Sequence, residues 1–274
     1  MVATSAIRLG RRRSQAVVTW SQDRDSGSVK RREGLGSLRL LPNDVRAADW
    51  IVAGVRDFDH TIGSMVPPLF EAYARVLHPA ARGDVEVTWA QVAAANGRHA
   101  HASMEWVGIT GSWAFLHGQV QPEVWDTEPD EGSLPAAQAE ALTTVLAGFT
   151  STADDCFYAV WDGFGALALE DDATASRVQM PQRPMLLTTG PLRQAGRVSM
   201  ETPPWDQSPS LWWPADRAWC VATDVDLMST YLGGSQACID AVLAAPGLEA
   251  WPVPVDQRVS FDSDTLNPVP PPPV

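Results

Sequence analysis

Two aspartates in the last quarter of the chain, Asp224 and Asp226, have a residue type and spacing that can bind a divalent metal ion. They directly follow residues 219–223 (WCVAT), an apolar run that predicts a strand. Carboxylates two positions apart beyond a strand end can share a divalent cation that activates water or binds an anionic group. The pair predicts the metal site of a hydrolase or transferase. The alternative is a polar turn that binds nothing.

A second group of oxygen ligands occurs at Asp262, Asp264 and Asn267. It can join Asp224 and Asp226 in one site if the fold brings the two groups together. It lacks the glycine and the distal glutamate of an EF-hand calcium loop. Asx turns, in which an aspartate accepts hydrogen bonds from the following backbone, explain the same spacing without a metal.

The histidines give a weaker metal hypothesis. His99 and His101 are two residues apart with Glu105 nearby, which can supply two imidazoles and a carboxylate to one ion. The alternative is a polar loop that follows a helix. His78, which precedes a proline, is expected to be a packed or capping histidine beside Arg75.

Tryptophan is the most unusual feature of the composition, with 12 Trp against 3 Tyr. Trp205, Trp212 and Trp213 lie in a stretch rich in Pro, Ser and Asp, so we expect them to be partly exposed. Together with Asp216 they predict a surface for a protein partner, because tryptophan is enriched at binding hot spots. A shallow groove that stacks sugar rings on the same residues is the alternative.

The sequence has no motif for serine hydrolysis, phosphate binding or dinucleotide binding. The sequence has no G-x-S-x-G, no Walker loop and no dinucleotide-binding glycine pattern, and its one lysine is Lys30. Cys156, Cys220 and Cys238 are widely spaced in apolar surroundings, which predicts buried free thiols rather than zinc ligands or disulfides. No cofactor is predicted.

The net charge of −13 is unevenly distributed. Residues 1–34 hold 8 Lys and Arg against 3 acids, whereas the remaining residues hold 12 Arg against 30 acids. An acidic body repels phosphate backbones and excludes general nucleic-acid binding by the folded part. No apolar run is long enough to span a membrane, and the arginines at 11–13 lack the apolar region of an export signal. We expect a cytoplasmic protein.

Helix signals occur at three places. Thr88 is expected to cap a helix over 89–96 that ends at Gly97, and Ser133 to cap one over 135–149. Ser235 is expected to cap a helix over 236–245, with 233–234 as the preceding turn. Residues 48–58 fit a helix or a strand.

Strands are predicted over several short apolar runs, and residues 162–182 and 196–209 are expected to be loops. The predicted strands cover residues 69–77, 157–161, 185–189, 211–213, 219–223 and, at an edge, 248–253. This pattern predicts one α+β domain over 35–266 with a mixed, mostly antiparallel sheet and three or four helices. A disordered basic head (1–34) and a proline-rich tail (267–274) are expected to flank it.

Four segments of the chain resemble sequence motifs of one group of proteins. They are FEAYARVLHPA (70–80), LWWPADRAWCVAT (211–223), YLGGS (231–235) and DSDTLNP (262–268). In this order they are similar to a group of uncharacterised actinobacterial proteins, with a resemblance that spans about residues 50–268. The resemblance implies no activity and supplies no catalytic residues.

The sequence therefore favours a protein-interaction module, for example a neutralising or regulatory partner of a basic protein. A metal-dependent hydrolase or transferase using Asp224 and Asp226 is the first alternative. A carbohydrate-binding module is the second.

Overall fold

The computed structural model describes residues 38–55, 59–116, 118–163, 175–197 and 207–271. Contacts divide the chain into Met1–Arg31 and Arg32–Val274. The first unit, and with it the predicted basic head up to residue 34, lies outside the described residues. The second unit is an α+β domain, as predicted.

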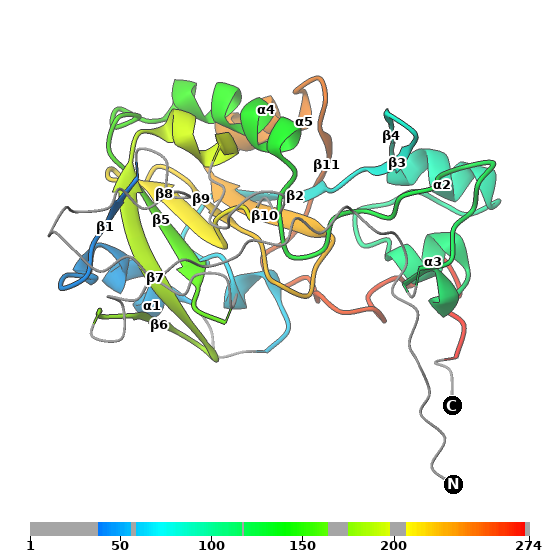
Figure 1. The fold of residues 1–274 in the computed structure, drawn as a ribbon, viewed down its shortest axis with the longest axis horizontal. Coiled ribbons are helices and arrows are strands. Elements are labelled where there is room, and N and C mark those ends of the chain that lie inside the picture. Colours follow the sequence, from blue (N-terminus) through cyan, green and yellow to red (C-terminus); the bar gives the residue numbers. More distant parts are fainter. Residues whose placement is uncertain (1–37, 56–58, 117, 164–174, 198–206, 272–274) are drawn as a thin grey trace, which may run out of the picture. The chain divides into compact units, whose positions relative to one another are not determined.

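An antiparallel sheet of nine strands organises this unit (Figure 1). Its strand order is β1-β7-β5-β8-β9-β10-β2-β11, and β6 pairs with β7 beside this path. The strands are β1 (Arg39–Leu40), β2 (Ala72–Leu77), β5 (Cys156–Trp161), β6 (Val178–Met180), β7 (Arg183–Gly190), β8 (Leu211–Pro214), β9 (Cys220–Ala222), β10 (Ser229–Gly234) and β11 (Glu249–Pro252). The predicted edge strand is β11, which pairs with β2 alone.

Helices cover both faces of the sheet. The helices α4 (Ala136–Leu146) and α5 (Gln236–Leu243) lie together on one face, and α1 (Asp49–Gly54) lies on the other (Figure 1). Each face has its own apolar cluster, with Leu142 and Ile239 contributing to the first and Ile51 to the second. Burial on both faces decides which side chains remain available for binding.

A smaller layer extends from the end of β2. It contains the hairpin of β3 (Ala80–Arg82) and β4 (Val85–Val87), then α2 (Trp89–Ala95) and α3 (Trp106–Thr110). Trp89, Trp106 and Trp125 form its core, with successive ring centroids 5.3 and 5.1 Å apart. The sequence predicted α2 but neither the hairpin nor α3.

Local capping was predicted well at two helices and wrongly at a third. Thr88 and Gln91 form a capping box at α2, and Ser235 accepts from the Cys238 amide at α5. Ser133 does not cap α4. Its hydroxyl instead accepts from the Ser208 amide at 2.9 Å, and the helix begins after Pro135 without a side-chain cap.

Gly233 and Gly234 are in strand β10 rather than in the predicted turn. A Cβ on Gly233 would lie 2.5 Å from the Phe70 ring, so glycine permits a close approach between layers at this position. The predicted loop over 162–182 contains the strand β6, and residues 164–174 of it lie outside the described residues.

Candidate functional site

The structure buries two of the tryptophans, Trp212 and Trp213, that the sequence predicted to form an exposed surface. Trp212 and Trp213 are only 1% and 0% exposed. Both belong to β8, and consecutive residues of a strand point to opposite faces of the sheet. Trp212 packs into the cluster under α4 and α5, and Trp213 packs into the cluster on the other face. The predicted exposure was wrong because both faces are covered. Trp205 lies outside the described residues.

Asp216, the fourth residue of that predicted surface, is exposed, but its carboxylate is hydrogen-bonded within the chain. Its carboxylate accepts from the Ser151 amide at 2.7 Å and from the Thr150 hydroxyl at 2.8 Å. Partial burial opposes ionisation, but these hydrogen bonds outweigh it and lower the pKa of Asp216. The carboxylate orders the loop after α4, and nothing apolar from β8 is exposed beside it.

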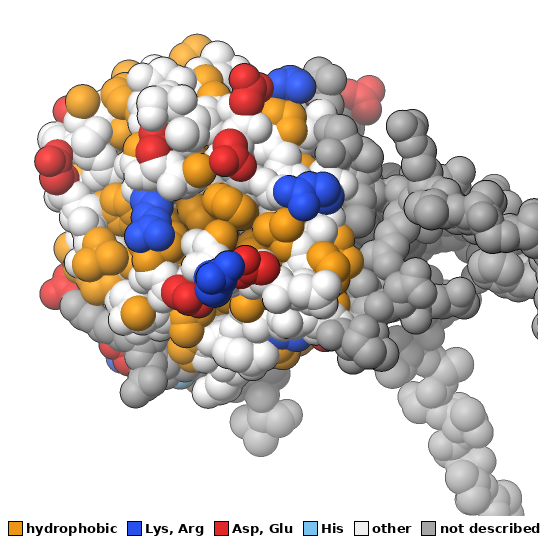
Figure 2. Space-filling model, turned by 90° about the vertical axis from the view of Figure 1, so that its left-hand side faces the viewer, with side chains coloured by type: hydrophobic (Ala, Val, Ile, Leu, Met, Phe, Trp, Pro, Cys, Tyr) orange, Lys and Arg blue, Asp and Glu red, His pale blue; other side chains and the backbone are white. Residues whose placement is uncertain are grey.

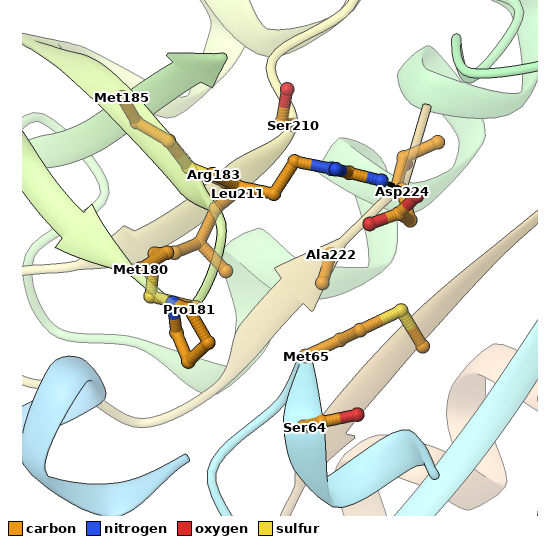
Figure 3. A pocket seen from close by; sticks show the side chains of 11 residues that line it. Ser64, Met65, Met180, Pro181, Arg183, Met185, Ser210, Leu211, Ala222 and Asp224 are labelled. Carbon is orange, nitrogen blue, oxygen red and sulfur yellow. Dashed lines mark hydrogen bonds and ion pairs between the residues drawn. The ribbon is translucent and has the colours of Figure 1, made fainter. Parts of the chain in front are cut away.

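A small cleft opens instead at one end of the sheet (Figure 3). In an antiparallel sheet the start of one strand lies beside the end of its neighbour. The start of β7, the start of β8 and the end of β9 therefore meet here, and the 3₁₀ turn over Ile62–Ser64 closes the opposite side. The cleft is lined by Ser64, Met65, Met180, Pro181, Arg183, Met185, Ser210, Leu211, Ala222, Thr223 and Asp224.

Both aspartates predicted to do chemistry lie at this cleft, and both bind Arg183. Arg183 Nη2 lies 3.0 Å from Asp226 Oδ2 and 3.4 Å from Asp224 Oδ1. In Figure 3 the arginine side chain extends across the cleft to Asp224. Its guanidinium carbon lies 5.2 Å from the ring centroid of Trp161, the last residue of β5. Asp224 is 13% exposed and Asp226 is 76% exposed, so one carboxylate is inside and the other faces solvent.

A second loop brings more negative charge to the same place. The Gly132 amide donates to the Leu227 carbonyl at 2.9 Å, which holds residues 130–132 against the turn that carries the two aspartates. Burial, together with the negative charge of Asp226, raises the pKa of Glu131, and burial raises that of Asp130. We call the cleft and the carboxylates of Glu131, Asp224 and Asp226 the acidic cleft.

A chain of buried hydrogen bonds connects the cleft wall to this acidic loop. The hydroxyls of Thr223 and Thr230 are 2.7 Å apart, and Thr230 Oγ1 is 2.9 Å from His78 Nε2. His78 Nδ1 is 2.6 Å from the Asp130 carbonyl, so it is the protonated nitrogen and donates there. Burial lowers the pKa of His78 to about 4, and the ring is neutral at pH 7. His78 is the packed histidine that the sequence suggested.

The faces of the domain differ in charge. Figure 2 shows the face around β1 and α1, where basic and acidic side chains are interspersed among hydrophobic ones. At the acidic cleft, by contrast, Asp224 and Asp226 both pair with Arg183, and Glu131 lies within reach of the charge of Asp226. The cleft is therefore the better place for a positively charged ligand.

A second polar cluster centres on Arg75, in the middle of β2. Arg75 is 2% exposed, and its guanidinium donates to the carbonyls of Ala102 at 3.2 Å and Met104 at 2.8 Å. It also donates to Ser229 Oγ at 3.1 Å and to Glu105 Oε1 at 3.2 Å. Burial raises the pKa of Glu105 to about 7, although the positive charge of Arg75 opposes this shift.

The C-terminal oxygen cluster belongs to this second region and not to the cleft. Asp264 Oδ1 lies 2.8 Å from His101 Nε2, and Asn267 bonds both the amide and the carbonyl of His99. Asp264 accepts from the Asn267 amide at 2.8 Å, which is the Asx turn that the spacing allowed. Asn267 is 2% exposed, so the fold continues past residue 266, where the sequence predicted its end. We call Arg75, His101, Glu105, Asp264 and Asn267 the Arg75 cluster.

These contacts bear on the predicted metal sites. Among the described residues, no group of three or more His, Cys, Asp or Glu is placed to hold a metal ion. Asp224 and Asp226 bind a guanidinium, and Asp262 bonds Ser260 and Arg258. The fold thus does not join the two aspartate pairs in one metal-binding group.

The cysteines match their prediction. Cys156, Cys220 and Cys238 are free and buried. Burial raises the pKa of the Cys156 thiol to about 12 and that of Cys238 to about 11. These thiols are protonated at neutral pH and unreactive.

Arg183 is the important residue that sequence reasoning missed. It is separated from Asp224 by 41 positions, and no local pattern connects the two. The usable signal was its place two residues before the predicted strand 185–189, because the start of one strand and the end of another can lie at the same end of an antiparallel sheet.

Comparisons with known proteins add no relative: no family model, no curated protein and no solved structure matches this chain. Within the described ranges, no helix is long and apolar enough to cross a membrane.

Proposed function

We propose that this protein is a cytoplasmic interaction module, a neutralising or regulatory partner, that binds a basic protein through the acidic cleft. An apolar side chain of the partner enters the cleft, and a neighbouring cation pairs with the surrounding carboxylates. The proposal keeps the function class favoured by the sequence and moves the binding surface from the tryptophans to the cleft.

One observation carries the proposal: Asp224 lines an apolar cleft, and Asp226 shares Arg183 with it. Met65, Met180 and Met185 line the cleft, and methionine side chains adapt to differently shaped apolar ligands. Asp226 is 76% exposed and therefore accessible to a cation from another molecule. An apolar anchor flanked by charge is the usual pattern of a protein-binding hot spot.

The charge of the chain supports a basic protein rather than a nucleic acid. Beyond residue 34 the sequence has 12 Arg and 30 acids, a surplus that attracts cationic proteins and repels phosphates. The free buried thiols fit a reducing compartment, which is why we assign the protein to the cytoplasm.

A direct test titrates the full chain with a short fluorescein-labelled peptide of alternating leucine and arginine, followed by anisotropy. We expect binding that weakens as salt is raised, and no binding of a leucine–glutamate counterpart. Met65→Trp, which fills the cleft, and Asp226→Asn are each expected to weaken binding about tenfold, or about 1.4 kcal/mol.

The matched control is Asp84→Asn, which removes the same charge from the exposed turn between β3 and β4. If Asp84→Asn weakens binding as much as Asp226→Asn does, only overall charge matters and the cleft is not the site. Failure of the basic peptide to bind at low salt would also refute the proposal.

A further inference from the structure

Arg183 occupies a small cage at the edge of the acidic cleft. Trp161 supplies an aromatic face 5.2 Å from the guanidinium carbon. Asp226 and Asp224 supply carboxylate oxygens 3.0 and 3.4 Å from Nη2. An aromatic face combined with carboxylates is the set of groups by which proteins bind an arginine from another molecule.

The local backbone holds these groups close together. Arg183 follows a two-residue turn, Pro181–Gln182, in which Gln182 has a φ of +58°. Proline followed by a residue of positive φ is the pattern of a type II turn, and for a residue other than glycine this conformation is unfavourable. A Cβ on Gly163 would lie 2.2 Å from the Trp161 ring, so only glycine leaves room for the indole.

The ion pairs of Arg183 with Asp226 and Asp224 are of a kind that can exchange. Asp226 is 76% exposed, and ion pairs with a solvated partner add little net stability. The hydrogen bond to Asp224 is long, at 3.4 Å. The arginine side chain can leave without removing any carboxylate or ring from the cage.

We propose that the cage of Trp161, Asp224 and Asp226 is an arginine-binding site, in which Arg183 is the resident occupant that an arginine of the basic partner replaces. This inference rests on the proposed function and specifies the partner: it presents an arginine next to an apolar residue. Because Arg183 belongs to the same chain, it competes at high effective concentration and lowers the affinity for any other arginine.

Replacing Arg183 by alanine tests the inference, because it vacates the cage. The full-length Arg183→Ala protein is titrated with Nα-acetyl-argininamide by isothermal titration calorimetry. We expect it to bind at least about tenfold more tightly than the wild type, because the resident competitor is gone. The corresponding lysine amide is expected to gain less, since it lacks the planar guanidinium that stacks over the Trp161 ring.

Arg193→Ala is the matched control, because Arg193 is 71% exposed and pairs with Asp154 away from the cage. It removes the same charge and is expected to leave binding as in the wild type. Adding Asp226→Asn to Arg183→Ala is expected to abolish the gain. Arg183→Gln replaces the alanine variant if urea denaturation shows that the latter is not folded.

Two results overturn the inference: an Arg183→Ala protein that binds argininamide no better than the wild type, or an equal gain in Arg193→Ala. Either result leaves the proposed function standing if the leucine–arginine peptide still binds the cleft. If that peptide fails while argininamide binds the vacated cage, the partner proposal fails and the arginine site remains.

Discussion

Two arginines on the same sheet have opposite surroundings. Arg75 is enclosed, donates to two carbonyls, a hydroxyl and a carboxylate, and is 2% exposed. Arg183 is 18% exposed, and one of its two carboxylate partners faces solvent. Both form ion pairs, and three further hydrogen bonds lock the Arg75 side chain in place. The difference separates a charge that holds the fold together from one that can be exchanged for a ligand.

The largest effect that would distinguish them is on stability. Arg75→Met leaves Glu105 and two carbonyls buried without their donor, so we expect a loss of about 3–5 kcal/mol in the free energy of unfolding. Arg183→Met is expected to lose less than about 1 kcal/mol, because Asp226, the nearer of its two carboxylate partners, is exposed to water. Urea denaturation of both variants measures this difference, and equal losses would remove the basis of the comparison.

The second effect is on the pH dependence of stability. It comes from His78, which lies between the acidic cleft and the Arg75 cluster. Its pKa falls from 6.5 in the unfolded chain to about 4 in the folded one, so the unfolded state takes up the proton first. The stabilisation is fully present above pH 6.5 and is lost as the pH falls through 4, by about 3 kcal/mol. Comparing the wild type with His78→Gln across this range isolates the effect, because glutamine keeps both hydrogen bonds without titrating.

Glu105 changes the free energy of unfolding with pH in the opposite direction, since burial raises its pKa to about 7. Its contribution is present below pH 4.5 and is lost as the pH rises through 7. This slope is the same in the wild type and in His78→Gln, and it cancels in the difference. A difference that does not change with pH would show that the pKa of His78 is the same in the folded and unfolded protein, so that burial does not lower it.

Gly108→Ala is expected to perturb the Arg75 cluster and to leave the acidic cleft unchanged. A Cβ there would lie 2.5 Å from Asp264 Oδ2, so the C-terminal segment must shift. We expect a loss of about 1–3 kcal/mol, as for other overpacked sites, and faster amide exchange near Asn267. Binding of the leucine–arginine peptide at the acidic cleft is expected to be unchanged, and a parallel loss of binding would mean that the two regions are coupled.

The smallest expected effect is at Asp226. Asp226→Asn should change the free energy of unfolding by no more than about 0.5 kcal/mol, because the side chain is 76% exposed. Thermal melts at low and high salt measure this. A loss as large as that of Arg75→Met would make the Arg183 ion pair structural and would count against exchange.

Local signals in the sequence predicted the parts of the fold that depend on local chemistry. Thr88 and Ser235 cap their helices because a hydroxyl beside free amides suffices, whatever the rest of the fold does. The strands β5 and β7 followed from short apolar runs bounded by glycine. The antiparallel α+β class followed from the order and shortness of these elements.

Features that depend on distant packing could not be predicted. Trp212 and Trp213 are buried because α4 and α5 cover one face and α1 the other, which the polar neighbours of β8 did not indicate. The contact of His101 with Asp264 joins residues 163 positions apart. Of the candidate site, Asp224 and Asp226 were predicted, whereas Arg183 was not, because only the strand order brings it to them.

The most direct measurement is a crystal structure of Arg183→Ala grown with Nα-acetyl-argininamide. We expect the ligand's guanidinium over the Trp161 ring, within hydrogen-bond distance of Asp226 and Asp224, with its amide end toward the methionine-lined cleft. An empty cage at saturating ligand, or a ligand bound elsewhere, would contradict the claim that Arg183 holds the place of a partner's arginine.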